Sequence, residues 1–197
     1  WFVIYVNQNG GELWGTRDAL RLSKVNPIWL PIVKGIGGTN QNLIDIAFSK
    51  NLNRLYVSAG SKVTRVDGLG SVYTSDPNFT SKAGYCCAPT YLDPPTGTSV
   101  STVYNGSVNG IALNPANSND LIVFPGTAAA KRSIDAGSAT PTFTTLSPIT
   151  SSNSPFSYDG IIDRDDSDII VVGTSHGVFV SDNGGTSWTN SSAGFEG

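Results

Sequence analysis

The chain has 197 residues, a formal net charge of −3 and 14% charged residues. This length is enough for one domain with a sizeable core, and the abundance of Gly, Ser, Thr and Asn suits short strands and polar turns better than helices. The acidic balance and the absence of a Lys/Arg cluster argue against nucleic acid, whose phosphates require a basic patch. No apolar run reaches the ~18–20 residues that cross a bilayer, so we expect no membrane insertion.

The N-terminal stretch begins with the apolar run 1–6, and the chain contains no methionine. A native start supplies an initiator Met, or a signal peptide with a basic region before its apolar stretch. We therefore expect a processed product or an excerpt of a longer polypeptide. Residues 1–6, 12–15 and 28–32 are predicted to be the second, third and fourth strands of a repeat unit whose first strand is missing.

Three later segments share one pattern: a short apolar strand, a polar turn rich in Asn, Asp and Ser, and a β-branched strand that ends at Gly. They are residues 44–60, 109–126 and 159–173. This pattern is typical of β-hairpins. Each unit is expected to continue with a third strand, a turn and a fourth strand, most clearly at 177–181 and 187–190 in the last unit and at 130–134 and 142–146 in the unit before it.

The repeat predicts an all-β fold, a β-propeller of four-stranded antiparallel blades. We expect one propeller segment over 1–197, with blades at 1–34, 43–105, 107–149 and 157–192. Closed propellers have roughly 4–8 blades, so these roughly 3.5–4 blades could close in principle. Because the chain begins inside one blade and stops right after a fourth strand, we expect part of a larger propeller instead.

The second unit is longer than the roughly 40–50 residues of a usual blade, which indicates an insertion at 67–105. A loop of this length inside a repeat is usually functional or disordered. It contains Cys86 and Cys87, the two cysteines of the chain. A disulfide between adjacent cysteines is strained, and two thiolates alone make no zinc site, so their redox state stays open.

The segment 181–188, Ser-Asp-Asn-Gly-Gly-Thr-Ser-Trp, resembles the Asp-box or BNR repeat, whose pattern is Ser-x-Asp-x-Gly-x-Thr-Trp. The matching or nearly matching positions are Ser181, Gly185, Ser187 and Trp188, and Asn183 stands where the family usually has Asp. A worn second copy keeps Ser133, Asp135 and Gly137, with Phe143 in place of the Trp. Only a trace remains in the first unit, at 16–18 and Trp29.

The resemblance implies a turn between the third and fourth strands on the outer rim of a propeller, away from the central channel. An Asx side chain there can accept hydrogen bonds from the backbone of its own turn, Gly tolerates positive φ, and the Trp ring is buried between strands. The motif is therefore expected to serve folding. The superfamily includes sialidases, xyloglucan-cleaving glucanases, sortilin-like receptors and secreted bacterial surface proteins, and this chain looks most like the secreted and cell-surface bacterial members.

Catalysis of glycoside hydrolysis needs two carboxylates that flank the scissile bond. Glu occurs only at 12 and 196, and the arginine motif of sialidases is absent. Xyloglucanase-like members use Asp residues from different blades, and the candidates by position are Asp45 and Asp159, at the starts of predicted innermost strands. Asn109 matches Asp159 in the repeat, which favours local hydrogen bonding as the competing explanation.

A metal site is the other candidate. Closely spaced carboxylates suggest calcium at Asp163, Asp165, Asp166 and Asp168. The segment lacks the Gly and the distant bidentate Glu of an EF-hand and falls on a hairpin turn, so a solvated turn is the alternative. His176 is the only histidine and follows a predicted strand end, and a lone histidine does not by itself make a triad.

These observations favour a non-catalytic, secreted or cell-surface binding or scaffold module that needs no cofactor. Its partner would be a protein or glycan at a propeller face or at the 67–105 loop, beside remaining blades of the same longer polypeptide. Two alternatives stay open: part of a glycoside hydrolase, xyloglucanase-like or sialidase-like, whose carboxylates lie mostly elsewhere, and a structural subunit of a bacterial surface or secretion assembly.

Overall fold

The computed structural model describes residues 2–5, 12–15, 30–34, 43–51, 53–59, 61–70, 99–126, 129–150 and 156–193. Its strands, in chain order, are β1 (Phe2–Tyr5), β2 (Glu12–Gly15), β3 (Leu30–Lys34), β4 (Leu43–Phe48), β5 (Arg54–Ala59), β6 (Lys62–Asp67), β7 (Ser99–Asn105), β8 (Gly110–Leu113), β9 (Leu121–Phe124), β10 (Lys131–Ser133), β11 (Thr144–Thr145), β12 (Ser157–Ile162), β13 (Ile170–Thr174), β14 (Gly177–Ser181) and β15 (Thr189–Asn190). Within the described residues, no helix is long and apolar enough to cross a membrane.

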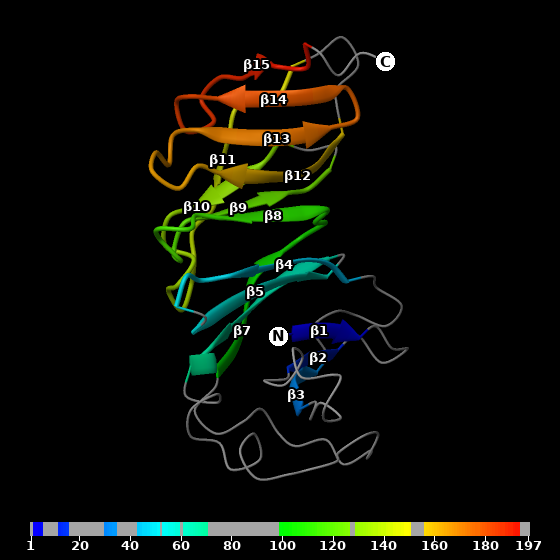
Figure 1. Cartoon of the computed structure of the whole chain (residues 1–197), viewed down its shortest axis with the longest axis vertical. Helices are drawn as coiled ribbons and strands as arrows, with labels where there is room; N and C mark the ends of the chain where they lie inside the picture. The colour runs from blue at the N-terminus through cyan, green and yellow to red at the C-terminus, as the bar shows by residue number, and fades with distance from the viewer. Residues whose placement is uncertain are drawn as a thin grey trace, which may run out of the picture.

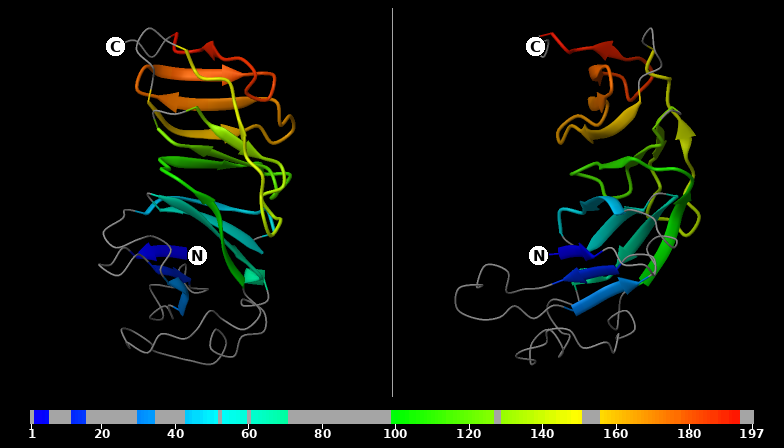
Figure 2. Two further views of the ribbon diagram at one scale, coloured as in Figure 1. Left: turned by 180° about the vertical axis from the view of Figure 1, so that it is seen from behind. Right: turned by 90° about the vertical axis from the view of Figure 1, so that its right-hand side faces the viewer.

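The strands form four antiparallel sheets that follow one another along the long axis of the molecule (Figure 1; Figure 2). We number them blade 1 (β1–β3), blade 2 (β4–β7), blade 3 (β8–β11) and blade 4 (β12–β15). In each blade every strand pairs with the next strand in the chain, and blades 2 to 4 have four strands each. The predicted four-stranded antiparallel blades are therefore confirmed.

The first strands of blades 2, 3 and 4 lie side by side, because β8 contacts both β4 and β12 (Figure 1). These are the innermost strands of a propeller arrangement. Their N-terminal ends lie along one side of the stack of blades, which we call the start face. The candidate residues Asp45 and Asp159 both lie there, near the first residues of β4 and β12.

The segment expected as an insertion contains a strand, because β7 (Ser99–Asn105) pairs with β6 and completes blade 2. Residues 71–98, with Cys86 and Cys87, fall outside the described residues, as do 16–18 and Trp29. In blade 1 the third of the strands spans Leu30–Lys34, two residues later than the predicted 28–32.

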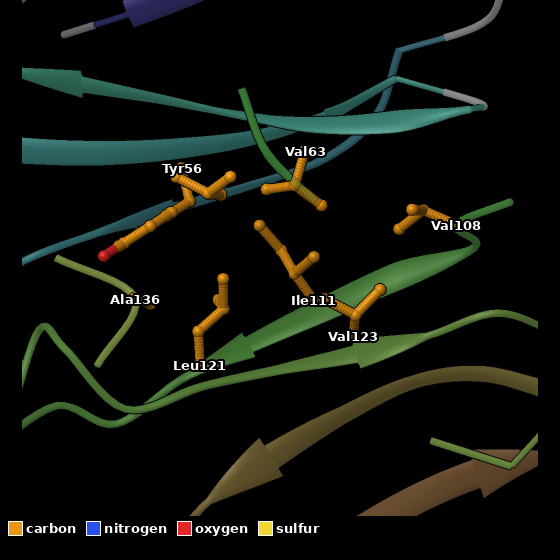
Figure 3. Packing of buried hydrophobic residues seen from close by; sticks show 8 residues of the cluster. Tyr56, Val63, Val108, Ile111, Leu121, Val123 and Ala136 are labelled. Atoms are coloured by element: carbon orange, nitrogen blue, oxygen red, sulfur yellow. The ribbon is translucent and has the colours of Figure 1, made fainter. Parts of the chain in front are cut away.

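Two apolar clusters join the described blades. Between blades 2 and 3, Tyr56 and Val63 point toward Ile111, Leu121 and Val123 (Figure 3). Between blades 3 and 4, the buried residues are Ala112, Ile122, Phe124, Ala130, Ile162, Ile170 and Val172. Alternate residues of one strand therefore serve different interfaces, since successive side chains of a strand point to opposite faces of the sheet.

Arginines add polar contacts between blades. Arg65 of β6 donates to the carbonyls of Ala136 (2.6 Å) and Ser138 (2.7 Å) in blade 3. Arg132 of β10 forms an ion pair with Asp120 (2.7 Å) and donates to the Ser167 carbonyl of blade 4 (3.0 Å). The pKa of Arg132 is raised, first by its hydrogen bonds to Asp120. Each arginine thus reaches forward to the next blade in the chain.

Candidate functional site

The 181–188 turn, which carries the sequence motif, is built by local hydrogen bonds. Ser181 Oγ accepts the Gly185 N–H (2.8 Å), and Asn183 Oδ1 accepts the Ser187 N–H (2.9 Å). Gly184 and Gly185 have φ of 68° and 88°, which favours glycine at both positions. Trp188 packs against the cluster between blades 3 and 4, and its Nε1 donates to the Ser147 carbonyl (2.8 Å).

The 133–143 turn of blade 3 repeats this geometry. The hydroxyl of Ser133 donates to Asp135 Oδ1 (2.8 Å), and the same carboxylate accepts the Thr142 N–H (2.8 Å). These hydrogen bonds lower the pKa of Asp135, with the Thr142 N–H as the largest cause. Phe143 packs against the cluster between blades 2 and 3. It corresponds to Trp188 of blade 4, which packs against the cluster between blades 3 and 4. Gly137 lies so close to Asn119 and Arg54 that a side chain there would collide with both. The motif residues of both turns are therefore engaged in turn geometry and packing.

The register of the innermost strands differs from the sequence alignment by one residue. The N–H groups of Ser49, Asn114 and Asp163 each close the first hairpin turn of their blades. Counted back from these residues, Asp159 matches Gly110 and Asp45, and the expectation that it matches Asn109 is wrong. Asp45 and Asp159 therefore occupy the same position in blades 2 and 4.

A β-bulge precedes each of these two carboxylates. The pairing register shifts between Leu43 and Asp45 in β4, and between Ser157 and Asp159 in β12. Bulges re-aim side chains and are common next to functional sites. Asp45 Oδ1 then accepts the N–H of Ile46, and Asp159 Oδ1 accepts the N–H of Gly160, both at 2.7 Å.

Gly110 separates the two carboxylates. Asp45 Oδ2 accepts the N–H of Ile111, the next residue of the neighbouring blade (2.9 Å). On the other side, a Cβ at Gly110 would stand 2.9 Å from Asp159 Oδ1 and 3.0 Å from Asp159 Cα. The missing side chain therefore allows Asp159 of blade 4 to approach Gly110, next to the residue that Asp45 of blade 2 binds.

The two carboxylates differ in electrostatic environment. The pKa of Asp159 is raised, mainly by desolvation, and the negative charge of Asp45 adds to the rise, while the Gly160 N–H opposes it. Asp159 still reaches solvent, so this desolvation is partial. Asp45 has a backbone N–H on each of its oxygens. A carboxyl group with a raised pKa suits a general acid, whereas the two hydrogen bonds of Asp45 hold it to the backbone of two blades.

The Asp-rich turn of blade 4 uses its carboxylates to bind backbone. Asp163 Oδ1 accepts the N–H groups of Asp165 (2.8 Å) and Asp166 (3.0 Å), and Asp166 Oδ1 accepts that of Asp168 (3.0 Å). These bonds lower the pKa of Asp163. Asn114 binds the equivalent turn of blade 3 in the same way. Among the described residues, no group of three or more His, Cys, Asp or Glu is placed to hold a metal ion.

Aromatic residues at the start face were missed by the sequence reasoning. Tyr158, the bulged residue before Asp159, is 52% exposed and contacts Phe156 with ring centroids 5.2 Å apart. Ser175 Oγ accepts the Phe156 N–H (3.0 Å) and lies 2.9 Å from Nδ1 of His176, which is also exposed. The sequence signal was present as Phe-x-Tyr-Asp at 156–159, but the bulge at Tyr158 could not be read from it.

Comparison with known proteins identifies the fold. No family model matches the chain, and no curated protein matches its sequence. Solved structures do match: a GH74 enzyme from Niastella koreensis (TM-score 0.58, 17% identity, 96% of this chain and 27% of that chain) and an ancestral GH74 enzyme (0.56, 18%, 96% and 22%). A GH74 xyloglucanase from Xanthomonas campestris also matches (0.53, 14%, 95% and 28%).

The chain therefore has the fold of part of a β-propeller, and it spans about a quarter of the length of these structures. At this level of identity the similarity concerns the fold alone. The propeller expectation is confirmed.

Proposed function

We propose that this chain is a non-catalytic binding segment of a larger, extracellular Asp-box propeller protein, and that its start face contacts a carbohydrate. The observation that carries the proposal is the state of Asp45. Both of its oxygens accept backbone N–H groups, one from its own strand and one from blade 3. A carboxylate engaged in this way joins two blades, so its presence at this position is explained by the fold without a catalytic role.

Carbohydrate binding is supported by the side chains at the same face. Tyr158 is exposed beside Phe156, and Asp159 and His176 lie close by with exposed polar atoms. Aromatic rings with an apolar body, surrounded by a few polar groups, are the usual lining of small-ligand sites. Sugar rings offer both an apolar face and hydroxyl groups to such a surface.

The Asp-box assignment rests on the two turns with matching hydrogen bonds at 181–188 and 133–143. Secretion follows from the same resemblance, because the matching motif looks most like that of secreted and cell-surface bacterial proteins. Both statements are part of the proposal.

Binding of a xyloglucan oligosaccharide, measured by isothermal titration calorimetry, tests the proposal. Tyr158→Ala should weaken binding about tenfold or more, since about 1.4 kcal/mol of lost contact gives this factor. Ile134→Ala is the matched control, because Ile134 is 74% exposed but lies in the 133–143 turn. Unchanged affinity in Tyr158→Ala, or no binding of the oligosaccharide to the parent chain, would contradict a glycan site at Tyr158.

A glycoside hydrolase is the second candidate, and the raised pKa of Asp159 favours it, because a general acid must hold its proton near the working pH. The GH74 fold of the neighbours is consistent with this function. Release of reducing ends from xyloglucan would decide. Activity that is lost in Asp159→Asn, with an unchanged unfolding midpoint, would replace the non-catalytic proposal with this one.

A further inference from the structure

Blade 4 has an outer face with no neighbour among the described residues. Three positions per blade, related by strand register, form the face that each blade turns to the next. In blade 2 these positions are Ala47, Tyr56 and Val63, and in blade 3 they are Ala112, Ile122 and Ala130. The same register assigns Ile161, Val171 and Val178 in blade 4.

The burial of these positions differs between blades 2 and 3 on the one hand and blade 4 on the other. Tyr56 and Ile122 are 0% exposed, because the following blade covers them. Ile161 is 63% exposed, and Val171 and Val178 are only partly buried. The blade 4 face is thus apolar at the positions that are covered in blades 2 and 3.

A hydrogen-bond acceptor at the inner edge of this face also lacks the contact that a following blade would supply. Asp45 binds its own strand through Oδ1 and the N–H of Ile111 in the next blade through Oδ2. Asp159, at the equivalent position, makes the first of these bonds with the same 2.7 Å length. Its Oδ2 has no hydrogen-bond partner among the described residues.

We propose that the outer face of blade 4 receives a further four-stranded blade of the same polypeptide, and that Asp159 Oδ2 accepts a backbone N–H from the first strand of that blade. The chemistry of the occupant follows from the two interfaces already present. Its second strand presents aliphatic residues at alternate positions, as Leu121 and Val123 do toward blade 2 and as Ile170 and Val172 do toward blade 3. Continuity of one repeated interface carries the assignment.

Cysteine labelling tests this proposal in two proteins, the 197-residue chain and the full product of the gene that encodes it. Ile161→Cys is made in each after Cys86 and Cys87 are changed to Ser, and the rate of reaction with a maleimide is measured by mass spectrometry. We expect Ile161→Cys to react quickly in the 197-residue chain. In the full product its rate should be lower by about tenfold or more, since a covered site reacts only on local opening. Ile134→Cys, 74% exposed on another turn, is the control and should react alike in both.

Equal rates of Ile161→Cys in the two proteins, or a gene product without a further blade, would overturn the proposal. Protection in the 197-residue chain together with a dimeric mass by light scattering would also overturn it, because a second copy would then cover the face. Val178→Cys provides an independent position should Ile161→Cys fail to fold. In addition, Asp159→Ala should lower the urea midpoint of the full product by more than that of the 197-residue chain, because both lose the bond to the Gly160 N–H and only the full product loses the bond to the next blade.

Discussion

Gly110 is the position at which the smallest change should have the clearest effect. An added methyl group would meet the carbonyl oxygen of Tyr158, Asp159 Oδ1 at 2.9 Å and Asp159 Cα at 3.0 Å. Two of these atoms belong to the backbone of β12, which is held in a sheet and cannot rotate away. Gly110→Ala must therefore push blades 3 and 4 apart at their innermost strands.

The size of the effect follows from two opposing contributions. Replacing Gly by Ala restricts the unfolded chain and stabilises by about 0.4–1 kcal/mol where the site accepts the methyl group. Overpacking of a tight site costs about 1–3 kcal/mol. We therefore expect Gly110→Ala to lower the free energy of unfolding by about 1–2 kcal/mol, a substantial share of the ~5–15 kcal/mol of an ordinary domain.

Gly173→Ala is the matched control, because a Cβ there would have the Asp159 carbonyl oxygen at 3.8 Å, an ordinary contact. It should be neutral or slightly stabilising. Urea unfolding followed by tryptophan fluorescence gives the two midpoints. A midpoint for Gly110→Ala equal to or above that of Gly173→Ala would refute the placement of Gly110 against Asp159.

Three further outcomes are expected. Trp188→Phe should cost about 1 kcal/mol in urea unfolding, because the Ser147 carbonyl loses its hydrogen bond; no change would contradict the contact. Arg132→Ala should lower the free energy of unfolding by about 3–5 kcal/mol, since it leaves the buried charge of Asp120 without its ion-pair partner. As a control, Arg164→Ala removes an exposed arginine and should change stability by less than about 0.5 kcal/mol. The folded pKa of Asp135 is depressed, so the stability it contributes is present above its unfolded pKa and is lost as the pH falls through the folded one. Asp135→Asn should therefore flatten the decline in melting temperature below about pH 4, and an unaltered pH profile would count against this.

The strands of blades 2 to 4 could be predicted because their sequence carries hairpin signals at the right spacing. Apolar and β-branched runs mark β5, β9 and β13, and Asn- and Asp-rich turns separate them from the strands before. The turn residues at 181–188 were also recognisable, since the side chains of Ser181 and Asn183 bond to neighbours in the sequence. Local interactions are what a single sequence records well.

The register of the innermost strands could not be obtained in the same way. An alignment on Ile111 and Ile161 shifts blade 4 by one residue, because the true reference points are the turn-capping residues Asn114 and Asp163. The bulges before Asp45 and Asp159 arise from pairing with distant strands and leave no local signal. The approach of Asp159 to Gly110 and of Asp45 to Ile111 therefore emerged only in three dimensions.

The forward reach of the polar contacts has a consequence for how such a protein can evolve. Asp45 and Arg65 extend from blade 2 to blade 3, and Asn109 and Arg132 extend from blade 3 to blade 4. Blade 3 thus carries the receiving half of one junction and the forward-reaching half of the next. Tandem duplication of the DNA for one blade copies both halves at once, so the series can grow or shrink by whole blades without inventing a new junction.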